Sequence, residues 1–377
     1  MKIGIFGGTF NPPHLGHLRL VRAFADRYAL DRVLIIPTFL PPHKSADSLT
    51  DGQTRMEMCR ILFDDPRFSV SDIELRRGGK SYTVETLRAM HMQFPQDRLY
   101  FLVGSDMLRS FDTWYLPDEI RSLCTLCAAV RHAGETLPKT QAEVLEHFDP
   151  VDVSSTEVRR LVRTGDRAEE FLGKALADYI AENDLYADCC TSYCRLLRQK
   201  LGAYRLRHSF AVADSAKALA QQYGGDEDKA YLAGLLHDVM KDTPKDGMLR
   251  FLLDAGVELT SAELHNPKLW HAMAGEAYLR TVLHFDDTDL LNAVRYHTTG
   301  RAGMSLLEKI LYVADYISAD RDYADVDKMR AFADESLERA MRFGLSFTIA
   351  DLAQKEQIIH PDSVDCYNEI CIQKERK

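Results

Sequence analysis

The sequence has no apolar run long enough to cross a membrane, and its first residues lack the charged, apolar and small-residue segments of a signal peptide. It also lacks the basic excess typical of nucleic-acid-binding proteins, because 57 acidic residues outnumber 47 Lys and Arg and the formal net charge is −10. We therefore expect a cytoplasmic protein that binds neither membranes nor nucleic acid. Small anionic ligands are still compatible with this charge, because a local basic pocket can form in an acidic chain.

Cysteine is also too scarce to form a disulfide framework, with eight in 377 residues. Cys124 and Cys127 form a C-x-x-C, but they lie in an expected strand, residues 123–130, where a separation of three places them on opposite faces. We interpret them as ordinary strand cysteines. A second cluster near the middle of the chain is interpreted as buried or free thiols: Cys189, Cys190 and Cys194.

The chain lacks repeats and a long Gly/Ser linker, yet 377 residues exceed one average domain. The first half alternates expected strands and helices, which is typical of a parallel sheet with right-handed crossovers. Strands are expected at 2–6, 33–37, 69–75, 99–103, 123–130 and 151–153, and helices at positions such as 55–63 and 84–94. The second half has only helical periodicities, for example at 206–219 and 231–239. We therefore expect an α/β domain at 1–187 and an all-α domain at 188–377.

The stretch K-I-G-I-F-G-G-T-F-N-P-P-H-L-G-H at 2–17 has the pattern of a strand, a glycine turn and a helix start. Backbone N–H groups in a glycine turn can approach a phosphate closely, and the helix dipole favours its negative charge. His14 and His17 can donate hydrogen bonds to the same anion from the first helical turn. The stretch therefore predicts a nucleotide site at the front of the α/β domain.

Other polar residues follow the expected strands, and ligands of parallel sheets bind outside the carboxyl ends of the strands. Lys44 is a candidate phosphate ligand, unless its Pro-rich loop is only surface, and Asp106 could hold ribose or a metal, or cap a helix. Trp114 could stack on a base or a pyridine, although a lone Trp is more often core. Ser154 opens a capping-box pattern, and Arg159 one turn later could reach phosphate oxygens.

Together these motifs resemble the bacterial nicotinate-nucleotide adenylyltransferases. The resemblance covers Met1 to about Tyr186 and rests on G-G-T-F-N-P-P-H-L-G-H at 7–17, P-P-H-K at 41–44, S-Y-T-V-E-T-L at 81–87, G-S-D-M-L at 104–108, W-Y at 114–115 and V-S-S-T-E-V-R at 153–159. It implies a nucleotidyltransferase α/β fold and adenylyl transfer from ATP to nicotinate mononucleotide, giving deamido-NAD and pyrophosphate with Mg²⁺. An adenylyltransferase for nicotinamide mononucleotide or phosphopantetheine is the alternative.

The reaction needs two anions held in line and charge neutralised at the α-phosphate and the leaving pyrophosphate. We assign this electrostatic role to His14, His17 and Lys44. ATP is expected to contact His17 and a further set of residues: Gly7, Gly8, Thr9, Phe10, Asp106, Ser154, Ser155, Thr156 and Arg159. By resemblance, Asp106 holds a ribose, and the nicotinate nucleotide lies at Thr83, Trp114 and Tyr115.

The second half carries its candidate chemistry in scattered His and Asp residues. His237 and Asp238 end an apolar segment, and Lys241 follows one turn later. Imidazoles combined with carboxylates suit Fe, Mn or Zn, and six such ligands suffice for two ions that share a bridging carboxylate. The six candidate ligands are His208, His237, Asp238, His271, His297 and Asp315.

Their order, H…HD…H…H…D, resembles the HD-domain phosphohydrolases and, more narrowly, the YqeK-type symmetrical diadenosine-tetraphosphate hydrolases. The supporting strings are R-H-S-F-A-V-A at 207–213, A-G-L-L-H-D-V-M-K-D at 233–242, L-W-H-A-M-A-G at 269–275, Y-H-T-T-G at 296–300 and Y-V-A-D-Y-I-S-A-D-R at 312–321. The resemblance, over about residues 193–347, implies cleavage of diadenosine tetraphosphate to two ADP at an iron-preferring dinuclear site. Asp238 would bridge the ions, and Lys241 and Arg321 would bind phosphate. Histidines outside these strings are interpreted as surface residues: His265, His284 and His360.

The sequence therefore predicts a bifunctional enzyme whose small-molecule partners are ATP, nicotinate mononucleotide and diadenosine tetraphosphate. Two alternatives stay open for the second half. It could hydrolyse another nucleotide, since Met240 stands where many HD proteins carry a small residue, or it could be a metal-bound module that senses a nucleotide without cleaving it. Whether the chain is a monomer or a homo-oligomer also stays open.

Overall fold

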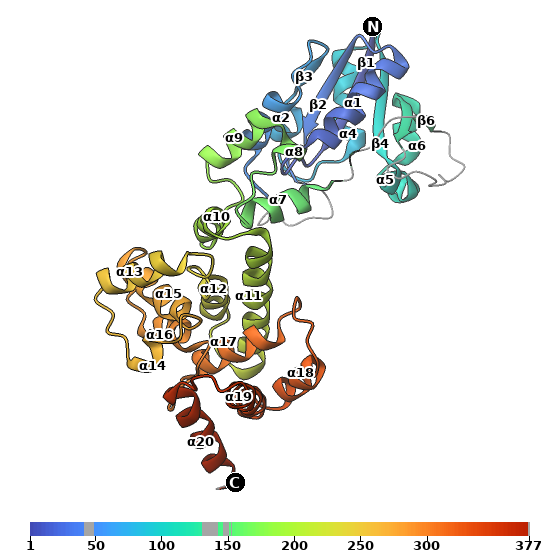
Figure 1. Cartoon of the computed structure of the whole chain (residues 1–377). Helices are drawn as coiled ribbons and strands as arrows, with labels where there is room; N and C mark the ends of the chain where they lie inside the picture. The colour runs from blue at the N-terminus through green and yellow to red at the C-terminus, as the bar shows by residue number, and fades with distance from the viewer. Residues whose placement is uncertain (41–48, 130–141, 146–150, 152, 376–377) are drawn as a thin grey trace. The chain divides into compact units, whose positions relative to one another are not determined.

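The computed structural model describes residues 1–40, 49–129, 142–145, 151 and 153–375. Its Cα positions divide the chain into two compact units, Met1–Thr191 and Ser192–Lys377 (Figure 1). Each unit is described by itself. Within the described ranges, no helix combines the length and the hydropathy that spanning a bilayer would require.

The first unit is built on a sheet of parallel strands in the order β3-β2-β1-β4-β5-β6. The strands are β1 Lys2–Gly8, β2 Arg32–Pro37, β3 Phe68–Val70, β4 Arg98–Gly104, β5 Thr125–Ala129 and β6 Glu143–Leu145. The chain moves outward from β1 to β3 and then returns to place β4 on the other side of β1. The strand order therefore reverses between β1 and β4, and such a reversal leaves a ligand crevice at the carboxyl ends of the strands.

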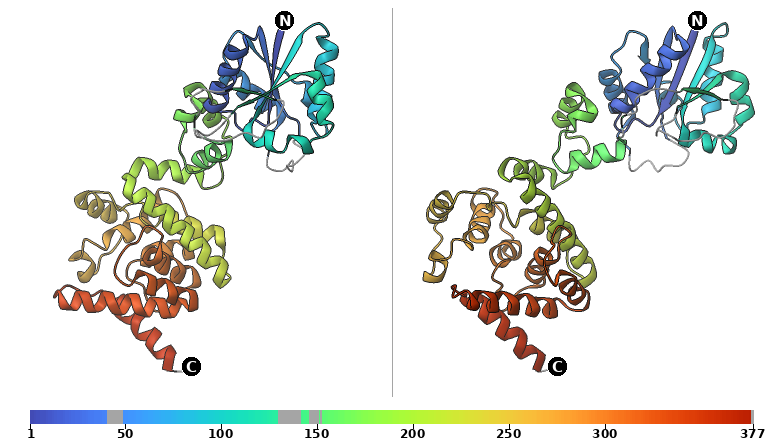
Figure 2. Two further views of the ribbon diagram at one scale, coloured as in Figure 1. Left: turned by 90° about the vertical axis from the view of Figure 1, so that its right-hand side faces the viewer. Right: turned by 45° about the vertical axis from the view of Figure 1, so that its right-hand side comes forward.

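Helices cover both faces of this sheet, as the left view of Figure 2 shows. Side chains alternate along β2, so that Val33 and Ile35 enter one core while Leu34 and Ile36 enter the other. The first core is covered by α1 Leu15–Tyr28, α2 Gly52–Leu62, α7 Ser155–Arg163, α8 Glu169–Leu172 and α9 Lys174–Glu182. The second core is covered by α4 Thr83–Gln93, α5 Ser105–Arg109 and α6 Pro117–Leu123.

This architecture confirms the predicted α/β class, but the third predicted strand is too long. It ends at Val70, and residues Ile73–Arg77 form the short helix α3. The apolar Ile73 and Leu75 suggested a longer strand, but Ile73 packs on the second core and Leu75 lies against Gly52 at the start of α2. Tertiary packing of these two side chains therefore decides the local structure.

The last predicted strand is also wrong. Val151 and Val153 lie outside any strand, and Asp152 is outside the described residues. The sixth strand is instead Glu143–Leu145, which pairs with β5 and is too short to show an alternating pattern in the sequence. The two cysteines of the C-x-x-C pack on opposite sides of the sheet, as expected, with Cys124 in the second core and Cys127 in the first. Only Cys127 lies in β5, because the strand begins at Thr125 and Cys124 follows α6.

The second unit is all-α, as predicted, over its described residues 192–375. Its helices are α10 Thr191–Lys200, α11 Ala203–Tyr223, α12 Glu227–Leu236, α13 Lys245–Asp254, α14 Ser261–Leu264, α15 Trp270–Thr281, α16 Thr288–Tyr296, α17 Leu306–Ile317, α18 Val326–Glu335, α19 Leu337–Gln354 and α20 Pro361–Glu375. The buried faces of α11, α12, α15, α16 and α17 are largely apolar.

Helices α11 and α12 pack closely because Gly234 has no side chain. A Cβ at this position would lie 2.7 Å from the Cα of Ala213 and 2.9 Å from its backbone nitrogen, closer than carbon atoms can approach. The carbonyl oxygen of Gly234 also lies 2.7 Å from Nδ1 of His237. The close packing therefore fixes the end of α12, from which the His237-Asp238 pair emerges.

We predict that Gly234→Ala destabilises the helical unit by about 1–3 kcal/mol, because backbone atoms cannot move aside for the new methyl group. Gly247→Ala is the matched control, since its Cβ would meet only Thr243 Cγ2 at 3.8 Å inside α13. That change should be neutral or stabilising by up to about 1 kcal/mol. Calorimetry of the full chain measures both, and equal melting temperatures for the two variants would contradict the prediction.

Candidate functional site

The loop after β1, Thr9–His14, ends as the N-cap of α1. The backbone N–H of His14 donates to Nδ1 of His17 at 3.2 Å, and the two imidazole centroids lie 3.7 Å apart. Because Nδ1 of His17 accepts, the proton of the neutral ring sits on Nε2. A side chain at Gly16 would come within 3.0 Å of His14 Nδ1. The sequence H-x-G-H therefore brings two imidazoles together at the helix start.

Arg55 of α2 holds this loop through hydrogen bonds to its backbone. This residue was not identified from the sequence. Its guanidinium is buried and donates to the carbonyl oxygens of Thr9 and Thr38 at 2.9 and 2.6 Å, and to that of Thr50 at 2.9 Å. Burial lowers the pKa of Arg55, against the attraction of nearby acidic groups. One cation thus joins the segments that follow β1 and β2, and a lone Arg in an amphipathic helix gives no sequence signal for that role.

The start of α7 is held against the same loop. Ser155 Oγ donates to the carbonyl of Pro12 at 2.8 Å, and Arg159 Nη1 donates to the carbonyl of Asn11 at 2.7 Å. The hydroxyl of Tyr186 donates to Asn11 Oδ1 at 3.0 Å. Three segments far apart in the sequence therefore meet at the end of β1, where the strand order reverses.

Ser154 is the N-cap of α7 and accepts from the backbone N–H of Glu157 at 3.1 Å. The carboxylate of Glu157 pairs with Arg160 at 2.6 Å instead of returning to the cap. Only half of the predicted capping box therefore forms. The predicted ATP-binding residues of β1 and α7 nonetheless lie in one place: Gly7, Gly8, Thr9, Phe10, His17, Ser154, Ser155, Thr156 and Arg159.

The predicted nicotinate-binding residues follow a different part of the sheet. The ring of Tyr115 is 55% exposed and lies 5.2 Å from that of Tyr82, which directly precedes Thr83 at the start of α4. Trp114 packs on Phe111, with ring centroids 5.1 Å apart. Two further predicted residues are not described: Lys44 and the side chain of Asp106 lie outside the described part of the chain.

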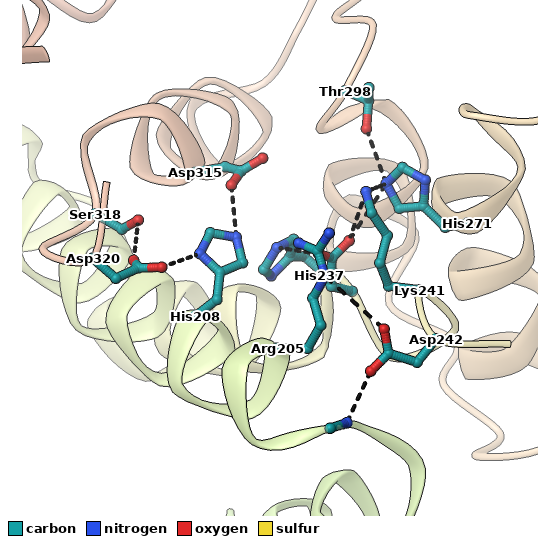
Figure 3. Close-up of polar contacts among 12 residues, drawn as sticks. Arg205, His208, His237, Lys241, Asp242, His271, Thr298, Asp315, Ser318 and Asp320 are labelled. Carbon is teal, nitrogen blue, oxygen red and sulfur yellow. Dashed lines mark hydrogen bonds and ion pairs between the residues drawn. The ribbon is translucent and has the colours of Figure 1, made fainter. Parts of the chain in front are cut away.

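In the second unit, the six predicted metal ligands lie in or directly after five helices. Figure 3 labels four of them, His208, His237, His271 and Asp315. His208 lies on α11 and His271 near the start of α15. The other four residues lie at or near the ends of helices. His237 and Asp238 follow α12, His297 follows α16, and Asp315 lies near the end of α17.

Three of the imidazoles are oriented by the same kind of hydrogen bond. Nδ1 of His237, His271 and His297 lies 2.7–2.8 Å from the carbonyl oxygen three residues earlier in the chain. A carbonyl oxygen can only accept, so Nδ1 carries the proton in each neutral ring and the Nε2 lone pair faces the opposite way. Backbone carbonyls at or beside helix ends therefore set the tautomer that a metal ion requires.

These Nε2 atoms converge on Asp238. Oδ1 of Asp238 lies 3.4 Å from Nε2 of His271 and 3.8 Å from that of His297, while the two Nε2 atoms are 3.3 Å apart. Oδ2 lies 3.6 Å from Nε2 of His237. Asp238 Oδ1 and His237 Nε2 are buried without a hydrogen-bond partner among the described residues. The centre is therefore rich in lone pairs, and two of the atoms that carry them have no such partner there.

His208 is oriented by carboxylates instead. Its Nδ1 lies 2.9 Å from Oδ2 of Asp320, and its Nε2 lies 3.0 Å from Oδ1 of Asp315. Arg321 contacts Asp315 Oδ1 with Nη2 and donates through Nε to the Asp315 carbonyl at 2.8 Å. Arg321, predicted to bind phosphate, therefore orients a predicted ligand in this structure.

The electrostatics favour neutral rings at His271 and His297 and an ionised carboxylate at Asp238. Burial lowers the pKa of His271 to about 3 and that of His297 to about 4. Burial would raise the pKa of Asp238, but His237 and Lys241 hold it below its usual value. Burial opposes protonation of His208, yet the hydrogen bond to Asp315 raises its pKa overall. At neutral pH His271, His297 and Asp238 thus have the forms that coordinate divalent cations, whereas His208 would have to release a proton to bind one through Nε2.

The donor set fits one or two transition-metal ions. His208, His237 and Asp315 offer atoms within 4.8 Å of one another, and so do His237, Asp238 and His297. The buried atoms of His237 and Asp238 that lack hydrogen-bond partners are those a cation would satisfy. His237 belongs to both groups, and Oδ2 of Asp238 lies 3.6 Å from its Nε2.

Sequence reasoning missed two charged residues of this centre. Arg205, one turn before His208 on α11, lies with Nη1 3.4 Å from Asp238 Oδ2. Asp320 orients His208 across 112 residues of sequence. The prediction for His360 is wrong, because its side chain is buried, with Nε2 3.6 Å from Oε1 of Glu263. His265 and His284 are exposed, as predicted.

The fold and the two sites define a nucleotidyltransferase-type α/β unit followed by a helical unit with an HD-type cluster. Residues 5–161 match the model of the cytidylyltransferase-like family, and residues 205–320 match that of the HD domain. The chain is 39% identical over 191 residues to a probable nicotinate-nucleotide adenylyltransferase of Shouchella clausii, covering 50% of this chain and 97% of that protein. A protein of the same name from Thermus thermophilus is 39% identical over 187 residues, covering 49% and 100%. Through its first half the chain belongs to the nicotinate-nucleotide adenylyltransferase family, and it carries an HD domain in its second half.

Among solved structures, a predicted HD superfamily hydrolase involved in NAD metabolism from Clostridium acetobutylicum is 37% identical. That match has a TM-score of 0.47 and covers 49% of this chain and 98% of the other. A nicotinic acid mononucleotide adenylyltransferase of Plasmodium falciparum is 17% identical with a TM-score of 0.41, covering 49% and 96%.

We predict that Arg55→Met destabilises the first unit by roughly 3 kcal/mol or more, because several carbonyl oxygens lose their donor. Arg60→Met on the same helix is the control. Arg60 is half exposed and pairs only with Glu57 in the recorded contacts, so its loss should cost less than about 0.5 kcal/mol. Urea unfolding measures both variants, and faster hydrogen exchange at residues 9–14 should accompany only the Arg55 change. Similar unfolding for both would contradict the structural role of Arg55.

Proposed function

We propose that the chain is a bifunctional enzyme that transfers an adenylyl group from ATP to nicotinate mononucleotide and symmetrically hydrolyses diadenosine tetraphosphate. The expected domain boundary, 187/188, is supported by the two compact units that meet between Thr191 and Ser192. The first activity follows from family membership, and the second from the cluster around Asp238.

For adenylyl transfer, the observation that carries the proposal is the convergence of two helix N-termini, α1 and α7, on the loop after β1. Helix N-termini and backbone N–H groups bind phosphates, and the adjacent imidazoles of His14 and His17 add donors. The 5′-phosphate of the acceptor attacks the α-phosphorus of ATP and the P–O bond to pyrophosphate breaks, so no covalent protein intermediate is needed. Mg²⁺ would enter with the ATP polyphosphate.

Each group has a separate task in this step. His17 would donate through Nε2 to oxygens on which charge grows in the transition state, and His14 packs on its ring and fixes it. Lys44 and Arg159 are proposed to add positive charge, and Asp106 to bind a ribose. Thr83, Trp114 and Tyr115 are proposed to enclose the pyridine ring.

For the hydrolase, the carrying observation is that three Nε2 lone pairs and the Asp238 carboxylate meet in a buried centre, where Asp238 Oδ1 and His237 Nε2 have no hydrogen-bond partner among the described residues. We propose that His208, His237, Asp238 and Asp315, with His271 and His297, hold two divalent cations, iron by resemblance. Bound cations of this kind polarise phosphoryl oxygens and lower the pKa of a water nucleophile. Asp238 would bridge them, Lys241 would bind a phosphate of the substrate, and Arg321 would keep Asp315 in position.

We predict that His17→Ala lowers the turnover of adenylyl transfer by about a hundredfold or more while ATP affinity changes little, because the donor acts chiefly in the transition state. Pyrophosphate release measures turnover, and ATP titration of the apo protein measures affinity. Parallel assays with nicotinate mononucleotide, nicotinamide mononucleotide and phosphopantetheine identify the acceptor. Unchanged turnover in the variant, or preference for another acceptor, would refute that part of the proposal.

We predict that the full chain with Mn²⁺ or Fe²⁺ converts diadenosine tetraphosphate to two ADP and that Asp238→Ala reduces this to background. Chromatography of the products separates symmetrical cleavage from release of ATP and AMP. Asp246→Ala is the control, as this residue lies in the first turn of α13 away from the cluster. Binding without cleavage by the wild-type chain would favour the sensing module instead.

A further inference from the structure

Lys241 lies in the turn after α12, and its ammonium reaches the edge of the ligand cluster (Figure 3). Nζ lies 2.9 Å from Nε2 of His271 and 3.6 Å from Oδ1 of Asp238. Burial lowers the pKa of Lys241, against the attraction of Asp238. In this structure a protein cation therefore occupies space beside two atoms that were assigned to a metal ion.

His271 cannot serve both cations at once. Its Nδ1 is 2.8 Å from the carbonyl oxygen of Lys268, so Nε2 has the single lone pair of the neutral ring. Lys241 donates to that lone pair, and a coordinated ion would need the same one. An ammonium and a divalent cation a few ångströms apart also repel each other strongly in a buried site.

At the other end of the cluster the nearby protein cation is Arg321, whose Nη2 contacts Asp315 Oδ1 and lies 3.4 Å from Nε2 of His208. His208, His237 and Asp315 present donor atoms within 4.8 Å of one another, and among the described contacts Lys241 makes no hydrogen bond to any of them. A first cation bound there would therefore leave Lys241 on His271. The two ends of the cluster differ in that Lys241 donates to a predicted ligand atom only at the His271 end, among the described contacts.

We propose that Lys241 is an internal competitor for the second of the two cations, and that a phosphate group opens this position by drawing the ammonium off His271. The competition follows from the contacts alone. Only the effect of phosphate rests on the proposed hydrolase function. The side chain of Lys241 is 28% exposed and carries four rotatable methylene groups, so its head can turn toward an incoming anion without moving the backbone.

The test is a Mn²⁺ titration of the full chain. Calorimetry measures the two binding affinities, and the electron paramagnetic resonance signal distinguishes a single bound ion from two coupled ions. Lys241→Met keeps the length of the side chain and removes the donor. We expect it to tighten binding of the second ion by about tenfold or more, because a charged hydrogen bond no longer blocks His271. Lys245→Met, an exposed position at the start of α13, should leave both affinities unchanged.

A double-mutant cycle assigns the effect to His271. His271→Ala should lose the second ion, and in that background Lys241→Met should bring no gain. Inorganic phosphate should tighten the second ion in the wild-type chain and have little effect in Lys241→Met. An unchanged second affinity in Lys241→Met, or a gain that persists without His271, would overturn the competition.

The experiments with inorganic phosphate and with diadenosine tetraphosphate test the proposed role of Lys241 and the proposed hydrolase activity separately. Absence of diadenosine tetraphosphate cleavage would reject the proposed substrate and leave the metal titration readable. A phosphate effect of equal size in wild type and Lys241→Met would reject the opening step.

Discussion

The hydrogen bond from a histidine Nδ1–H to the carbonyl three residues earlier is the interaction on which the helical centre depends. It recurs at His237, His271 and His297, each beside the start or end of a helix. Because the acceptor is backbone, the tautomer is fixed by the helix and not by another side chain. Three lone pairs are thereby turned toward Asp238, and the buried centre can be satisfied only by positive charge.

The candidate site of the first unit is built from different groups. Its described contacts around the loop after β1 are helix ends, imidazoles and backbone groups, with no buried carboxylate cluster among them. Arg55 and Arg159 both donate hydrogen bonds to backbone carbonyl oxygens of that loop and of neighbouring segments. Their positive charge nevertheless lies near the loop, so they shape it and add to the local field.

The sequence allowed the two fold classes and most of the candidate site to be predicted, because each motif occupies a few adjacent residues. His237-Asp238 at the end of an apolar helix and H-x-G-H at a helix start are examples. Arg205 and Asp320 escaped notice, since their partners lie 33 and 112 residues away and no spacing rule joins them. His360 was misjudged for a similar reason, because it is buried in the fold near Glu263 of α14, which is far away in the sequence.

The two ends of the helical centre are built differently, and this difference has a physical consequence. His208 is held by the carboxylate of Asp320 and contacts Asp315, which Arg321 orients in turn, so this end carries fixed negative charge near its donor atoms. His271 and His297 are held by neutral carbonyls, and the only anion close to their Nε2 atoms in the described contacts is Asp238. A cation is therefore attracted more strongly to the His208 end. Because the two donor groups share His237, an ion bound at one end repels an ion at the other, and unequal affinities follow from the charge distribution even before Lys241 is considered.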